Sequence, residues 1–103
     1  MYDVKMQRIA VDAYVIDALM PDLAGHDRRP SAFLVYLYLW RRSEAAAKPV
    51  CASYQMLADG TGLSKGSAQA AVRALARRQL LVIARRTKTA APVFTLQCHW
   101  RVR

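Results

Sequence analysis

The side chains best suited to binding a polyanion are concentrated in the last 44 residues of the chain. Residues 60–103 hold nine Lys or Arg and no Asp or Glu. Within them, and starting just before, lies LADGTGLSKGSAQAAVRALARRQLL (57–81), a run typical of two short helices joined by a tight turn. A helix pair whose charged side chains from residue 60 onward are all cationic suits the phosphates of a nucleic acid duplex.

Catalytic and metal chemistry find little support in the sequence. The run GTGLSKGS (60–67) contains three glycines and a lysine, but a phosphate-binding P-loop needs Gly-Lys-Ser/Thr in that order after a buried strand. Here the lysine precedes the glycine. The two histidines, His26 and His99, have no metal-ligand spacing to each other or to either cysteine. We therefore expect no enzymatic activity, no metal and no cofactor.

Length and composition indicate a single domain spanning residues 1–103. The chain is 54% hydrophobic and 22% charged, with a net charge of +9, so it can bury one core. Its longest apolar run, residues 32–40, is nine residues, whereas a bilayer crossing needs about 20. The N-terminus also lacks the pattern of a secretory signal. We expect a cytoplasmic protein with no membrane partner.

The first quarter of the chain has the opposite charge. Residues 1–27 carry five Asp against one Lys and one Arg, which favours packing or self-association over contact with phosphate. Apolar residues at helical spacing predict a helix over about 5–20, ended by Pro21 and a connector. Packing of this helix on its own core would explain its apolar face, but we expect a homodimer interface formed by Ile9, Val11, Tyr14, Val15 and Ile16.

Residues 31–48 predict a long central helix that is buried nearly all round. The segment has no internal Gly or Pro and ends in a helix-favouring Glu-Ala-Ala-Ala tail. Pro30 suits the first helical turn, and Glu44 with Lys48 form a pair four residues apart. The apolar centre would also fit a strand, but its unbroken length favours a helix.

A short strand, VCA (50–52), and two further helices are predicted to follow. Ser53 and Ser64 are natural N-caps of helices over 54–60 and 65–78. Gly62 supplies the backbone freedom of the turn between them, and Ala58 must be small where the helices cross. The apolar positions expected to face the core are Leu63, Ala68, Val72 and Leu75.

Residues 53–81 resemble the helix-turn-helix of bacterial transcriptional regulators. The run SKGSAQAAVRALARRQLL (64–81) is especially similar to GntR-type and MarR-type winged helix proteins. In that comparison Ala58, Gly62, Leu63 and Ser64 fall on the turn, and residues 65–78 fall on the recognition helix. One departure is Gln79, where those families usually place Gly. Gln79 must therefore accept a left-handed backbone, or the helix must end differently.

Two strand-like segments follow, LLVIARR (80–86) and PVFTLQCHW (92–100), and the second alternates apolar and polar residues. The resemblance, which covers about residues 31–100, implies that this basic hairpin is a wing lying against DNA backbone or minor groove. The expected fold is mainly α with a small antiparallel β-sheet. It is a winged helix-turn-helix, with a three-helix core and β-hairpin wing in 28–103 and an extra N-terminal helix and connector in 1–27.

If helix 64–79 enters a major groove, the side chains opposite its buried stripe face the bases. Gln69 can bond adenine twice, Arg73 or Lys65 can bond guanine, and Ala70 can touch a thymine methyl. The expected base-reading residues are Lys65, Ser67, Gln69, Ala70 and Arg73. The expected backbone contacts, including those of wing 81–98, are Ser53, Ser64, Arg77, Arg78, Arg85, Arg86 and Lys88. The other arginines read as ordinary solvated charges; they include Arg28, Arg29, Arg41 and Arg42.

The resemblance implies a small transcriptional regulator that binds double-stranded DNA as a homodimer on a pseudo-palindromic site. Two alternatives stay open, a plasmid or phage replication initiator or accessory protein, and a protein-interaction adaptor with no nucleic acid partner. No small-molecule ligand can be identified. Cys51 and Cys98 are expected to be inert, partly buried thiols, with a bridge possible if their two strands are adjacent.

Overall fold

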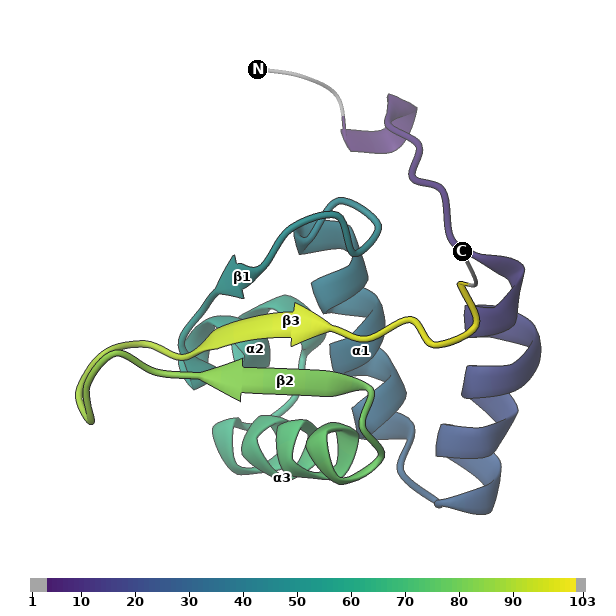
Figure 1. Cartoon of the computed structure of the whole chain (residues 1–103). Helices are drawn as coiled ribbons and strands as arrows, with labels where there is room; N and C mark the ends of the chain where they lie inside the picture. Colours follow the sequence, from purple (N-terminus) through teal and green to yellow (C-terminus); the bar gives the residue numbers. More distant parts are fainter. Residues whose placement is uncertain (1–3, 102–103) are drawn as a thin grey trace.

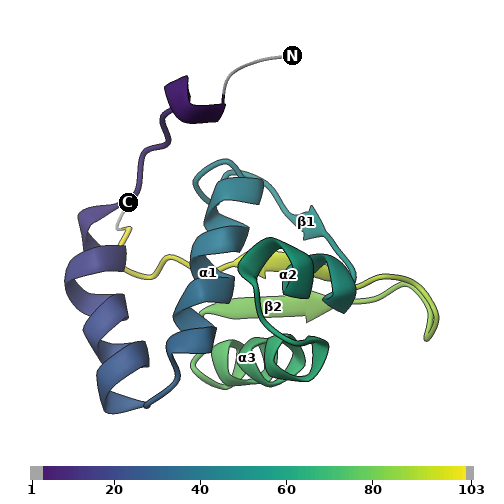
Figure 2. The same cartoon turned by 180° about the vertical axis from the view of Figure 1, so that it is seen from behind.

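The computed structural model describes residues 4–101, which form four helices, a short 3-10 turn and a three-stranded antiparallel sheet. Helix α1 lies in the middle, with the N-terminal helix (residues 13–26) on one side and the sheet, α2 and α3 on the other (Figures 1 and 2). The predicted winged helix-turn-helix fold is therefore confirmed. The elements in chain order are η1 (Val4–Met6), η2 (Val15–Leu19), η3 (Pro21–His26), α1 (Pro30–Arg42), β1 (Val50–Cys51), α2 (Tyr54–Thr61), α3 (Lys65–Arg77), β2 (Leu81–Ala84) and β3 (Val93–Leu96).

The sheet has the order β1-β3-β2, so the strand that precedes the helix pair joins the hairpin. Phe94 at its centre lies opposite Val50 on one side and Ile83 on the other. Its side chain is almost fully buried, together with Tyr36 and Trp40 of α1. Burial of large aromatic side chains stabilises such a small domain most per residue. Within residues 4–101, none of the helices has the length and apolarity needed to cross a membrane.

The N-terminal helix begins and ends later than the sequence predicts. The expected helix was 5–20, but residues 7–12 have no regular secondary structure and the helix runs from 13 to 26. The indole N–H of the buried Trp40 donates to the carbonyl of Ala10 at 2.8 Å, a carbonyl that lies outside any helix and is therefore free to accept. Pro21 does not end the helix, because it begins the π-helical segment η3, where its missing N–H falls at a junction.

Helix α1 is also shorter than expected, ending at Arg42 instead of Lys48. Glu44, Ala45 and Ala46 are left-handed, with φ of 54°, 60° and 68°. The fully buried Ser43 hydroxyl donates to the carbonyl of Trp40 and accepts from the amide of Ala46 at 3.0 Å. A serine that bonds nearby backbone in this way competes with the helix, and here it overrides the propensity of the alanines. The Glu44–Lys48 ion pair still forms, with a separation of 2.5 Å.

Helix α1 is not buried all round either. Arg41 and Arg42 are exposed at its end, and Leu34 is exposed near its start. The buried side faces both the N-terminal helix and α3, because α1 packs between them. A helix that contacts neighbours on two sides needs a wide apolar surface, which explains the dense apolar run in the sequence.

The turn between α2 and α3 follows the sequence-based expectation closely. The Ser53 hydroxyl accepts from the amide of Met56, and the Ser64 hydroxyl accepts from the amide of Ser67, both at 3.1 Å. Gly62 has a left-handed φ of 79°. Of the two alternatives for the end of α3, the first holds, because Gln79 itself takes a left-handed φ of 58°. The residues predicted to face the core are buried, apart from Leu63, which is partly buried.

The two cysteines are too far apart for a bridge within the chain, although β1 and β3 are adjacent as the bridge would require. Cys51 lies opposite Val93 in the sheet, whereas Cys98 comes five residues further along, roughly 16 Å at the rise of a strand. Burial raises the pKa of the Cys98 thiol. Cys51 is exposed, so the expectation of a partly buried thiol is wrong at that position.

Candidate nucleic-acid interface

Helix α3 has one buried side and one cationic outward side. Its small apolar residues face α1 and α2, which lets the three helices pack closely. Lys65, Gln69, Arg73 and Arg77 recur every four residues, so they form one ridge that turns by about 120° around the helix from the first residue to the last. The structure places every predicted base-reading residue away from the core: Lys65, Ser67 and Arg73 are exposed, and Gln69 and Ala70 are partly buried.

The first turn of α3 meets the start of α2 and the wing at a hollow of about 250 Å³. Lys65 and Gln69 line it from α3, Ser53 lines it from the start of α2, and Arg85 lines it from the wing. Two residues predicted to read bases, Lys65 and Gln69, thus lie beside two predicted to contact the DNA backbone, Ser53 and Arg85. Their donors and positive charge suit this hollow to a phosphate or a base edge.

The two capping serines have a structural role in this arrangement. Ser64 donates its hydroxyl to the Ser67 hydroxyl at 3.0 Å while it caps α3, so its hydrogen bonds are used within the helix start. Ser53 accepts from α2, and within residues 4–101 its own hydroxyl hydrogen has no acceptor. Ser53 can therefore still donate to a phosphate at the hollow.

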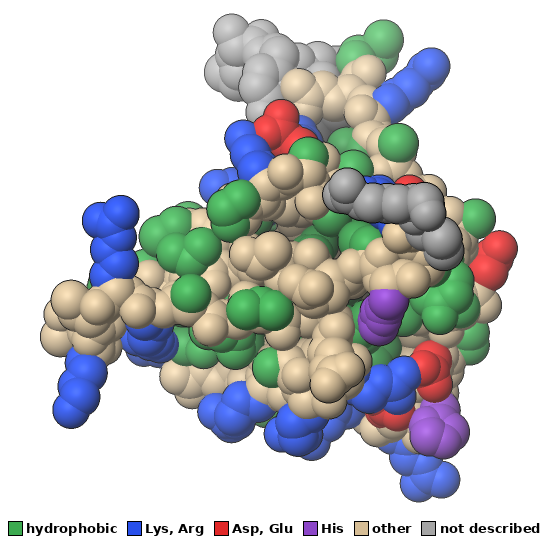
Figure 3. Space-filling model, in the orientation of Figure 1, with side chains coloured by type: hydrophobic (Ala, Val, Ile, Leu, Met, Phe, Trp, Pro, Cys, Tyr) green, Lys and Arg blue, Asp and Glu red, His purple; other side chains and the backbone are tan. Residues whose placement is uncertain are grey.

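The wing is held in shape by its own arginine. Nη1 of Arg85 donates to the carbonyls of Lys88 and Ala90 at 3.3 and 3.1 Å, and its guanidinium lies over the ring of Tyr54. Arg86 and Lys88 are exposed, and the tip of the wing carries cationic side chains away from the body of the protein (Figure 3). Arg85 thus shapes the loop that presents the other two charges.

Arg78 is not placed as the sequence predicted. Its Nη1 lies 3.0 Å from both carboxylate oxygens of Asp27, and its Nη2 pairs with Asp22. These contacts hold the end of α3 against the N-terminal helix, so Arg78 has a structural ion-pair role, and its predicted phosphate contact would compete with two carboxylates. Sequence reasoning missed this pairing, since the two aspartates lie more than 50 residues away from Arg78.

A second structural link joins Trp100 and Arg101 to the start of the N-terminal helix and the residue before it. Asp12 accepts from Arg101 Nε at 2.6 Å and from the indole of Trp100 at 2.8 Å. The hydrogen bonds from Arg101 and then Trp100 hold the pKa of Asp12 below its usual range. Tyr14 stacks on Trp100 with ring centres 4.6 Å apart. No spacing in the sequence could have indicated these contacts.

Asp22, His26 and Asp27 also lie close enough together to surround a metal ion. Arg78 already pairs with both carboxylates, and the hydrogen bond with His26 is the main cause that lowers the pKa of Asp27. A guanidinium occupies the place that a cation would take. We therefore treat this cluster as an ion-pair network.

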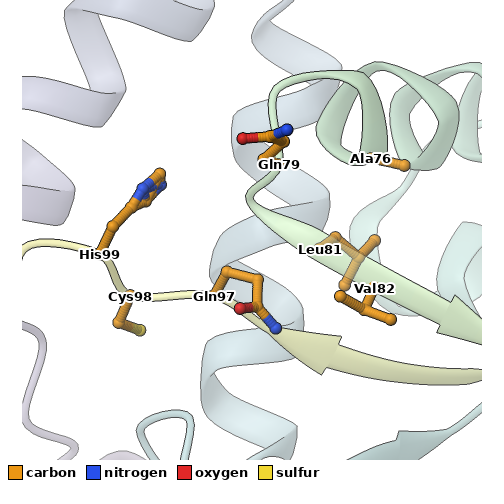
Figure 4. A pocket seen from close by; sticks show the side chains of 7 residues that line it. All are labelled: Ala76, Gln79, Leu81, Val82, Gln97, Cys98 and His99. Carbon is orange, nitrogen blue, oxygen red and sulfur yellow. The ribbon is translucent and has the colours of Figure 1, made fainter.

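A larger hollow of about 540 Å³ lies between the end of α3 and the sheet. Figure 4 shows Gln79, Gln97 and His99 around it, pointing in different directions, with Leu81 and Val82 of β2 beside them. A ligand site needs a few polar groups that converge on one point. This open hollow has none, so we assign no ligand to it.

The five residues expected at a dimer interface divide into two groups. Val15 is fully buried in the core and Val11 is partly buried against it, so these two pack within the chain. Ile9 and Ile16 are 47% and 41% exposed, and Tyr14 keeps part of its ring exposed beside Trp100. Val15 therefore packs in the core of its own chain, which was the alternative to a dimer contact.

Three helices followed by a hairpin, with cationic residues on the third helix and the hairpin, define the winged helix class of DNA-binding domains. A family profile described as "Helix-turn-helix domain" matches residues 29–81, from α1 to the first residue of β2. The match covers more than half of the chain, which therefore belongs to the helix-turn-helix domain family. Membership implies that the protein binds DNA, and the family is not usually enzymatic. No curated protein and no solved structure matches the chain.

Proposed function

We propose that the protein is a small transcriptional regulator of the bacterial type that binds double-stranded DNA sequence-specifically. The observation that carries this proposal is the hollow where α3, the start of α2 and the wing meet, which holds Lys65, Gln69 and Arg85. The likeness of residues 64–81 to GntR-type and MarR-type regulators supports the same role. The whole chain, residues 1–103, acts as one domain.

Helix α3 reads the major groove in this proposal. Lys65, Gln69 and Arg73 lie on one stripe, so a single approach of the helix brings them to successive base pairs. Gln69 pairs with adenine, and Lys65 or Arg73 with guanine, each worth about 1–3 kcal/mol of discrimination. Ser67 and Ala70 are short and allow the helix to come close. The resulting specificity per copy is modest.

The wing supplies contacts that do not depend on base sequence. Arg86 and Lys88 are exposed at the tip, and Arg85 keeps its Nε and Nη2 groups for phosphate while Nη1 holds the loop. Such contacts fix the position of a protein on the duplex without reading it. They also make binding sensitive to salt.

A homodimer would double the number of base pairs read. Ile9, Ile16 and Tyr14 remain exposed on the N-terminal segment, and Met20 adds a further exposed apolar side chain. Two copies joined through these residues would present their α3 helices about one helical turn of DNA apart. An inverted repeat in the bound sequence is the expected signature.

The test is selection of bound sequences from a random DNA pool at two salt concentrations. We expect an inverted repeat, and we expect Gln69→Ala and Arg73→Ala to relax the preferred sequence by about 1–3 kcal/mol at single positions. Arg86→Ala and Lys88→Ala should weaken all sequences alike. Arg8→Ala, which removes an exposed charge from the N-terminal segment, is the matched control.

Two outcomes would contradict the proposal. If no oligonucleotide is bound in dilute buffer, the cationic surface is not a DNA-binding surface. If the selected sites are direct repeats, a replication initiator or accessory role replaces the regulator.

A further inference from the structure

A second cationic surface lies at the other end of α3 from the wing. Arg29, at the start of α1, and Arg77, in the last turn of α3, line one hollow of about 280 Å³. Ala74 and the ion pair between Asp27 and Arg78 complete its lining. Two arginines that are 48 residues apart in the sequence therefore face the same space.

The charges of this hollow leave Arg29 and Arg77 available. Asp27 is engaged by Arg78 and His26, and Asp22 is engaged by Arg78. Among residues 4–101, no carboxylate oxygen comes within 4.0 Å of a nitrogen of Arg29 or Arg77, and both side chains are exposed. The hollow thus has two accessible guanidiniums, and with Arg78 its three arginines outnumber the two carboxylates that Arg78 pairs with.

The backbone just before α1 is shaped to bring Arg29 to this place. Arg28 has a left-handed φ of 54°, which is uncommon for a residue other than glycine. The chain reversal is fixed by a hydrogen bond from the amide of Arg29 to the carbonyl of Leu23 at 2.8 Å. It turns the start of α1 towards the end of α3.

The spacing along α3 fits the two backbones of a duplex. Arg77 follows Lys65 by twelve residues, which is about 18 Å along the helix axis and about 120° around it. The major groove is about 12 Å wide and is bounded by a phosphate backbone on each side. A straight helix of this length lying in the groove approaches a backbone at each end. In Figure 3, Lys and Arg side chains follow the α3 side of the molecule as far as the foot of the N-terminal helix.

We propose that Arg29 and Arg77 form a second phosphate-binding site for the same duplex, at the opposite end of α3 from the wing. The inference rests on the proposed DNA-binding function. It joins Arg77, already expected to contact the DNA backbone, with Arg29, which the sequence analysis treated as solvated charge. The site binds backbone phosphate and carries no base specificity.

The test measures the affinity of the full chain for a selected duplex and for an unrelated duplex over a range of salt concentrations. Arg29→Gln should reduce the salt slope by about 1, and Arg29→Gln with Arg77→Gln by about 2, with affinity at moderate salt falling roughly tenfold for both duplexes alike. Arg8→Gln is the matched control, because residues 7–12 lie at the opposite side of the molecule from α3 (Figures 1 and 2). Thermal unfolding should show that all variants stay folded.

A second measurement locates the phosphate. Single uncharged methylphosphonates are placed along each strand of the selected duplex, and one or two positions outside the wing contacts should weaken binding by wild-type protein. The Arg29→Gln variant should be insensitive at those positions.

The two failures are distinguishable. If the wild-type protein binds DNA but Arg29→Gln behaves like Arg8→Gln in slope and phosphate map, the second phosphate site is wrong and the proposed function stands. If the wild-type protein binds no duplex, the proposed function fails with it.

Discussion

The acidic N-terminal helix and the cationic surface of α3 and the wing use arginine in opposite ways where they meet. Arg77 and Arg78 are neighbours in the chain, yet Arg78 is paired with Asp22 and Asp27 while Arg77 faces solvent. One arginine joins two parts of the fold, and the other is available to a partner. Position relative to the N-terminal carboxylates, and not residue type, separates the two roles.

The largest expected effect comes from the residue that the N-terminal segment and the helical core share. Trp40 is fully buried, lies near Trp100 and donates to Ala10. We expect Trp40→Ala to lower the free energy of unfolding by about 3–5 kcal/mol, because it removes a large buried ring and leaves a cavity. Chemical denaturation measures this, with Leu34→Ala on the exposed side of α1 as the control.

An effect of less than about 1 kcal/mol for Trp40→Ala would show that the N-terminal segment is not integrated with the core. The N-terminal carboxylates could then not be said to separate the roles of Arg78 and Arg77.

Two glycines compare a tightly packed position of the α2–α3 unit with a position that faces solvent. A Cβ on Gly60 would collide with the ring of Tyr38, whereas a Cβ on Gly66 would meet no atom within 4 Å. We expect Gly60→Ala to cost about 1–3 kcal/mol through overpacking. Gly66→Ala should be neutral or stabilise the protein by up to about 1 kcal/mol, because alanine favours the helix. Thermal unfolding of the two variants gives the comparison directly, and equal melting temperatures would contradict it.

The neighbouring arginines provide the sharpest test of the two roles. Arg78→Ala should lower stability by about 1–2 kcal/mol, a partly exposed ion pair being worth less than a buried one. Arg77→Ala should change stability by less than about 0.5 kcal/mol and should weaken DNA binding at all sequences. Urea denaturation and DNA titration of both variants are needed. If the two variants behave alike in both measurements, the structural assignment of Arg78 is wrong.

The smallest expected effect is on the pH dependence of stability. Hydrogen bonds from Arg101 and Trp100 lower the pKa of Asp12 in the folded protein, and the hydrogen bond with His26 lowers that of Asp27. A group whose pKa is lower when folded adds stability above its unfolded pKa, which is about 3.9, and loses it as the pH falls through the folded value. Stability should therefore decrease below about pH 4.

Asp12→Asn removes one of these two carboxylates and should make the acid transition shallower. Thermal melts at pH values from about 2 to 7, in steps of about one pH unit, measure this. Asp17→Asn, at an exposed carboxylate with no partner within residues 4–101, is the control. An unchanged acid transition in Asp12→Asn would show that the Asp12 contacts do not contribute to folding.

Local signals in the sequence were enough for the helix-turn-helix and the wing. The capping serines, the left-handed Gly62 and the buried stripe of α3 depend on interactions within a few residues, so their spacing predicts the elements correctly. The alternation in the last strand is local as well, and it gave the correct core face of the hairpin. The absence of carboxylates after Asp59 likewise indicated the cationic surface from the sequence alone.

Other features required contacts between distant parts of the chain. The shift of the N-terminal helix follows from Trp40 needing an acceptor at Ala10, and the early end of α1 follows from the burial of Ser43. In both cases the cost of leaving a buried polar group unpaired exceeds the small free energies of helix propensity. The same reasoning separates Arg78 from Arg77. Charge count and helical spacing treat the two residues alike, and only the folded arrangement brings Asp22 and Asp27 to one of them.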